Sequence, residues 1–72
     1  MRIRWEDGAE IAVRIEDGMC VISANREGLL SLADQFRELA DQSPGSHLHL
    51  DEWNGLEEGS SELIAEKVPS RK

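Results

Sequence analysis

A strict alternation of polar and apolar side chains over residues 47–51 constrains the fold of this chain most strongly. Successive side chains of a β-strand point to opposite faces, so Leu48 and Leu50 share one face of the strand that this pattern predicts. The opposite face carries the polar side chains His47, His49 and Asp51. Trp53 has the parity of these polar residues, so we expect a strand over residues 47–53 with one buried and one open face.

The segment before this strand has the spacing of an amphipathic helix. Asn25 is a typical N-cap residue, and Pro44 and Gly45 are typical of the segment that follows a helix. The apolar residues between them recur at helical spacing: Leu29, Leu32, Ala33, Phe36, Leu39 and Ala40. The polar residues on the other side are Ser31, Asp34, Gln35, Glu38 and Asp41. We predict that the helix buries the apolar stripe and that Phe36→Ala costs about 3–5 kcal/mol.

The remaining strands are predicted from short alternating or apolar runs. Three such runs precede the helix and one follows the strand described above, at residues 2–5, 10–15, 19–22 and 62–68. Asp17-Gly18 lies between two of the runs and is a strong hairpin signal, because glycine accepts a positive φ.

Two of these runs carry predictions about burial. Alternation places three side chains of the first hairpin strand inward: Ile11, Val13 and Ile15. Residues 19–22 are apolar without alternation, which indicates a well-covered central strand. Cys20 lies in this run and is the single cysteine of the chain, so we expect a buried, unreactive thiol and no internal disulfide.

These elements predict one α+β domain over residues 1–72, in the order β-β-β-α-β-β, with residues 69–72 as a frayed tail. The single helix should pack on one face of a mostly antiparallel sheet and leave the other face open. By parity, the open face should carry Arg2, Arg4, Arg14, His47, His49, Asp51 and Trp53. The helix carries a competing acidic surface, formed by Asp34, Glu38 and Asp41.

Charge and length limit the classes of function. The formal net charge is −7, which argues against nucleic acid or an anionic membrane as a direct partner and suits a basic protein such as a nuclease. A chain of 72 residues needs most of its length for one core and has few further residues to form an active-site cleft, so we do not expect an enzyme. Residues 2–7 lack the apolar core of a signal peptide, and no run approaches the roughly 20 apolar residues of a membrane span, so we expect a cytoplasmic protein.

The two histidines raise the question of a metal site. His47 and His49 should lie about 6.5–7 Å apart at their Cα atoms, close enough for both imidazoles to reach one ion. Zinc needs a third strong ligand and usually a fourth, and the nearest candidates are Asp51 and Glu62. We therefore expect no metal and no cofactor, and keep a metal-binding domain as an alternative. No G-x-S-x-G elbow or phosphate-binding glycine pattern points to catalysis.

Four short motifs resemble the immunity protein 32-like family of bacterial polymorphic toxin systems, over residues 21–68. They are Asn25-Arg26-Glu27-Gly28-Leu29, Leu32-Ala33, His47-Leu48-His49-Leu50 and Gly59-Ser60-x-Glu62-Leu63-Ile64. The resemblance implies a cytoplasmic α+β domain that neutralises a cognate toxin by binding it, without catalysis. Its matching positions are Asn25, Gly28, His47, His49 and Ser60, of which only the two histidines lack a structural explanation.

The leading hypothesis is therefore a non-enzymatic protein-binding module, an immunity protein that binds its toxin through one of two surfaces. The first is the open sheet face with His47, His49, Asp51, Trp53 and Arg14, and the second is the acidic helix surface with Asp34, Glu38 and Asp41. The alternatives are a small metal-binding domain that uses the histidine pair and a homodimer formed by exposed strands.

Overall fold

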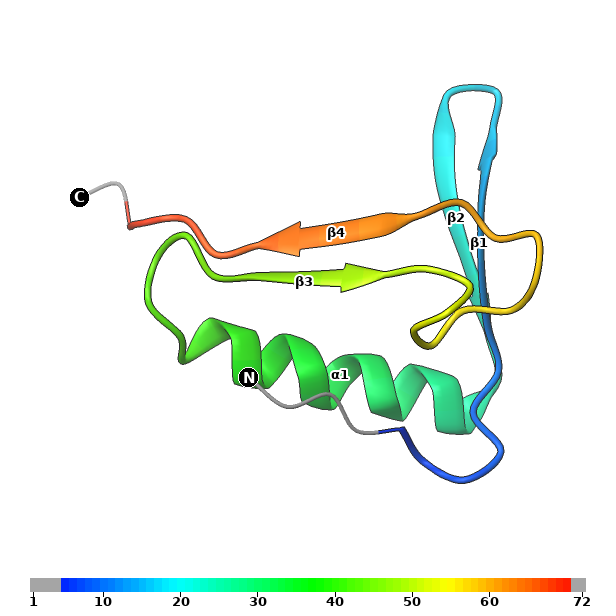
Figure 1. Ribbon diagram of the computed structural model, residues 1–72, viewed down its shortest axis with the longest axis horizontal. Helices are drawn as coiled ribbons and strands as arrows, with labels where there is room; N and C mark the ends of the chain where they lie inside the picture. Colours follow the sequence, from blue (N-terminus) through cyan, green and yellow to red (C-terminus); the bar gives the residue numbers. More distant parts are fainter. Residues whose placement is uncertain (1–4, 71–72) are drawn as a thin grey trace.

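A computed structural model describes residues 5–70 of the chain and contains one helix and four strands (Figure 1). In chain order these are β1 (Ile11–Glu16), β2 (Met19–Ala24), α1 (Arg26–Ala40), β3 (His47–Leu50) and β4 (Leu63–Glu66). The α+β class is confirmed. The strand predicted at residues 2–5 falls mainly outside the described residues, and Trp5, which is described, does not lie in a strand.

The four strands form two antiparallel hairpins instead of one sheet. β1 pairs with β2 and places Ile11 opposite Ala24, while β3 pairs with β4 and places His49 opposite Ile64. The first hairpin turns at Asp17 and Gly18, both of which have positive φ (51° and 78°), as the sequence predicts.

The loop between β3 and β4 explains why the two hairpins stay separate. The Glu57 amide donates to the Ile11 carbonyl (2.8 Å), and the Ser61 amide donates to the Val13 carbonyl (2.8 Å). In addition, the Val13 amide donates to the Ser60 hydroxyl (3.1 Å). The loop therefore occupies the edge of β1 that β2 leaves free, and no further strand can pair there.

The bounds of α1 agree with the sequence-based prediction. Asn25 is the N-cap, and its side-chain oxygen accepts from the Gly28 amide (2.8 Å) and from the Glu10 amide (3.0 Å). The helix ends at Ala40, before Pro44. In the described part of the chain, no helix has the length and hydrophobicity that crossing a membrane requires.

The face of α1 that is buried differs from the prediction. The buried residues are Gly28, Ser31, Leu32, Gln35 and Leu39. Phe36 and Leu29 are 41% and 54% exposed, so the prediction that both side chains pack inside is wrong. Gly28 gives the physical reason: a Cβ there would lie 2.6 Å from the Glu10 carbonyl oxygen. The missing side chain lets α1 lie close against Glu10 and Ile11 at Gly28, so the buried face follows Gly28 and Phe36 lies to one side of it.

Seven aliphatic side chains form the core: Ile11, Val13, Leu32, Leu39, Leu48, Leu50 and Leu56. The alternation that predicted Leu48 and Leu50 as buried is confirmed. Trp5 packs against this core, and its ring fills the space where a Cβ on Gly55 would lie.

The outer part of the first hairpin contradicts the predicted burial. Ile15 is 60% exposed, and β2 carries the exposed residues Met19, Cys20 and Ile22. The predictions of an inward Ile15, a covered central strand and a buried thiol are therefore wrong. The turn end of the hairpin projects past β4, where no described element covers it (Figure 1). Only its base, at Ile11 and Val13, reaches the core.

Candidate functional site

The outward side of β3 and β4 brings three potential metal ligands together. His49 Nε2 lies 2.8 Å from Glu62 Oε2 and 4.0 Å from Asp51 Oδ2. One ligand atom from each residue lies within 4.8 Å of the others. We call His49, Asp51 and Glu62 the His49 cluster. All three are at least partly exposed, since Leu48 and Leu50 use the opposite face of the strand for the core.

A tight turn after β3 holds Asp51 in place. The Asp51 and Asn54 backbones form two hydrogen bonds (2.9 and 3.3 Å), and the Leu56 amide also donates to the Asp51 carbonyl (3.0 Å). Asn54 Nδ2 donates to the His49 carbonyl (2.8 Å), which ties the turn to β3. Asp51 Oδ1 accepts from the Trp53 amide (2.9 Å), so Oδ2 is the oxygen that faces His49. The site therefore has a backbone fixed by hydrogen bonds.

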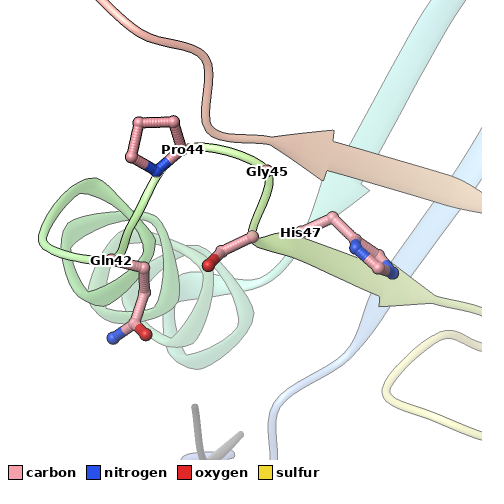
Figure 2. Close-up of a pocket in the computed structure, with 5 residues that line it drawn as sticks. Gln42, Pro44, Gly45 and His47 are labelled. Atoms are coloured by element: carbon pink, nitrogen blue, oxygen red, sulfur yellow. The ribbon is translucent and has the colours of Figure 1, made fainter.

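His47 shares the outward face of β3 but does not join the His49 cluster. It lies at the start of the strand and lines a shallow hollow with Gln42, Pro44, Gly45 and Ser46 (Figure 2). Within the described residues, the group that can hold a metal contains His49, Asp51 and Glu62. The histidine pair that the sequence offered as a metal-binding alternative is thus replaced by one histidine and two carboxylates.

Trp53 lies in the turn beyond β3, because the strand ends at Leu50 and not at residue 53. Its side chain is 93% exposed. Together with Glu52 and Glu58 it lines a hollow of about 410 Å³. Glu52 also accepts a hydrogen bond from the Gly59 amide. The structure thus places an exposed indole at a hollow that Glu52 and Glu58 also line, two residues after Asp51 of the His49 cluster.

Arg14 belongs to the other hairpin. It lies on β1, where it donates to the Ser23 hydroxyl (2.7 Å) and pairs with Glu16. The predicted open face is therefore divided between two sheets, with Arg14 on one and the histidines on the other. Arg2 and Arg4 lie outside the described residues.

The helix presents two exposed stripes on either side of its buried face. Asp34, Glu38 and Asp41 are exposed and follow helical spacing, as the sequence predicts for the acidic surface. The exposed apolar stripe consists of Leu29, Ala33, Phe36 and Ala40. Sequence reasoning missed this stripe because it merged these residues with Leu32 and Leu39. The apolar band on the helix is wider than the stripe that one helix face needs for packing on a sheet, and this width could have revealed the exposed stripe.

A protein-family model matches much of the chain. The model of the family described as Immunity protein 32 matches residues 20–68, which include α1, both strands of the second hairpin and the His49 cluster. No curated protein and no solved structure matches the chain. The match covers more than half of the sequence and confirms the resemblance seen in its motifs. The chain belongs to the Immunity protein 32 family.

Proposed function

We propose that this protein neutralises a cognate toxin by binding it directly, without catalysis. The observation that carries the proposal is Trp53, whose indole is 93% exposed on a short, hydrogen-bonded turn. Tryptophan is enriched among the residues that dominate binding energy at protein interfaces. Membership of the Immunity protein 32 family supports a toxin as the protein that Trp53 contacts.

The proposed interface is the outward side of β3 and the turn that follows it. It comprises His47, His49, Asp51 and Trp53, and Arg14 is a peripheral member because it lies on the other hairpin. The acidic helix surface of Asp34, Glu38 and Asp41 is the second choice. We favour the first surface because surface acid alone is explained by solubility, whereas an exposed tryptophan is not.

The partner proposed for this interface is a basic toxin, such as a nuclease, met in the cytoplasm. The net charge of −7 favours association with a cationic protein and disfavours nucleic acid or an anionic membrane. Glu52 and Glu58 line the same hollow as Trp53, and this combination suits a lysine or arginine side chain. Tryptophan is the best aromatic partner for a cation, and two carboxylates strengthen the attraction.

The test takes the product of a toxin-like gene next to this one as the candidate partner and measures binding kinetics with the purified proteins. At the first surface, His49→Ala and Trp53→Ala should each cost about 1–4 kcal/mol, mainly by raising koff, with little response to salt. At the second surface, Asp34→Lys combined with Glu38→Lys should slow kon, and this effect should depend strongly on salt.

The wild-type protein should also inhibit the toxin in a one-to-one complex. If only the variant that combines Asp34→Lys with Glu38→Lys changes the binding kinetics, the interface is the acidic helix surface. The absence of any complex with the wild-type protein would contradict the proposed function itself.

A further inference from the structure

We propose that His49, Asp51 and Glu62 bind one divalent transition-metal ion, such as Zn²⁺, on the outward side of β3 and β4. This proposal goes beyond toxin binding and does not depend on it. From the sequence, Asp51 and Glu62 were the nearest candidates for further ligands, and the pairing of β3 with β4 now brings Glu62 to His49. The register that places His49 opposite Ile64 brings Glu62, 13 residues later in the chain, within 2.8 Å of the imidazole.

The distances fit a shared ion. Zinc bonds to histidine nitrogen and carboxylate oxygen measure about 2.0–2.2 Å, so two ligand atoms of one tetrahedral ion lie roughly 3.4 Å apart. The two separations from His49 Nε2, 2.8 Å to Glu62 and 4.0 Å to Asp51, fall on either side of this value. Small side-chain rotations therefore suffice to reach coordination geometry.

The carboxylate of Asp51 is oriented for this role. One of its oxygens accepts from the Trp53 amide (2.9 Å), and the other faces His49. A hydrogen bond that fixes the non-ligating atom is the usual way in which proteins orient a metal ligand. Asp51 thus adds a third ligand atom within 4.8 Å of those of His49 and Glu62.

The donor set selects the class of ion. Two carboxylates carry a formal charge of −2, which balances a divalent cation, and an imidazole nitrogen favours zinc and its transition-metal neighbours over magnesium or calcium. The exposure of the cluster leaves the remaining coordination positions to water. We therefore expect binding in about the micromolar range and no tighter.

The experiment is a calorimetric titration of the full chain with zinc chloride at neutral pH. One ion should bind per chain, and His49→Ala should weaken binding at least about tenfold. Glu62→Gln and Asp51→Asn should have similar effects, and both keep the size of the side chain. Asparagine at position 51 also keeps an oxygen that can accept from the Trp53 amide, so a loss of fold is not expected.

His47→Ala is the matched control, because His47 lies on the same strand and the same face but outside the cluster. It should leave zinc affinity unchanged. No binding at about 1 mM zinc, roughly a thousandfold above the expected range, would overturn the proposal. An equal loss with His47→Ala, or no loss with either carboxylate variant, would overturn it as well. Because the titration uses metal alone, its failure leaves the toxin-binding proposal standing.

Discussion

The two hairpins of this protein have similar sequence patterns and different degrees of burial. In the second hairpin, both inward leucines of β3, Leu48 and Leu50, are buried beneath the sheet. In the first, burial falls along a single strand, from Ile11 at 0% exposed to Ile15 at 60% exposed. Helix α1 runs along β3 and β4 but does not reach the tip of the first hairpin (Figure 1). Alternation therefore predicts which way a side chain faces, while burial depends on whether another element covers that face.

Substitutions along β1 should reproduce this gradient and give the largest effect on stability. Ile11→Ala removes a fully buried side chain from the core and should cost about 2–5 kcal/mol. Ile15→Ala, the matched control on the same strand face, should stay within about 0.5 kcal/mol of the wild type. Urea unfolding of both variants provides the measurement. Equal losses would mean that the tip of the hairpin is covered after all.

Gly28→Ala tests the close approach that sets the buried face of α1. Although alanine favours helix by about 1 kcal/mol, a Cβ would lie 2.6 Å from the Glu10 carbonyl oxygen and 2.8 Å from Ile11 Cγ1. We expect a net loss of about 1–2 kcal/mol, which lowers Tm by several degrees in a domain of this size. Ala33→Gly, the reverse change at an exposed position of α1, should also lower the stability, because glycine has a lower helix propensity than alanine. A stabilising Gly28→Ala would contradict the packing described here.

Asn25 links the first hairpin to α1 and should give a smaller effect. Besides capping α1, its side chain accepts from the Glu10 amide and donates to the Gly8 carbonyl (2.8 Å), so it ties the base of the first hairpin to the helix. Asn25→Ala should cost about 1 kcal/mol. Asn25→Asp keeps the acceptor and loses the donor, so thermal melting should place it between the wild type and the alanine variant. Identical melting of all three proteins would rule out this link.

Phe36→Ala should have a far smaller effect than the loss of about 3–5 kcal/mol expected from the sequence. Because the ring is 41% exposed, its removal should cost less than about 1.5 kcal/mol. Leu39→Ala, three residues later on the buried face, should cost about 2–5 kcal/mol. Chemical unfolding of the two variants compares the two faces of α1 directly. A larger loss of stability for Phe36→Ala than for Leu39→Ala would mean that Phe36 is buried, as the sequence predicted.

Local signals predicted the elements of this fold well. Asn25 and Pro44 bracketed the helix, Asp17-Gly18 marked a hairpin turn, and the alternation of residues 47–51 placed both leucines in the core. Each of these signals acts through neighbours in the chain, namely capping bonds, positive φ and side-chain parity. For this reason the α+β class could be predicted from the sequence.

The arrangement of the elements depended on contacts between distant residues. The buried face of α1 follows from the missing Cβ of Gly28 against Glu10, and the separate sheets follow from the loop amides of Glu57 and Ser61 that bond to β1. The His49 cluster likewise depends on a contact between residues that are distant in the sequence. Its histidine and Asp51 were predicted to share a face, but the strand register that places Glu62 beside them cannot be derived from local patterning.

The most direct test of the central claim, that the outward side of β3 and its following turn bind the toxin, is amide hydrogen exchange with and without the toxin. We expect slower exchange on complex formation in residues 47–54 and 62–66, which carry the His49 cluster and Trp53. Exchange in α1 should stay unchanged. Protection confined to the helix, around Asp34 and Glu38, with none near Trp53, would contradict it.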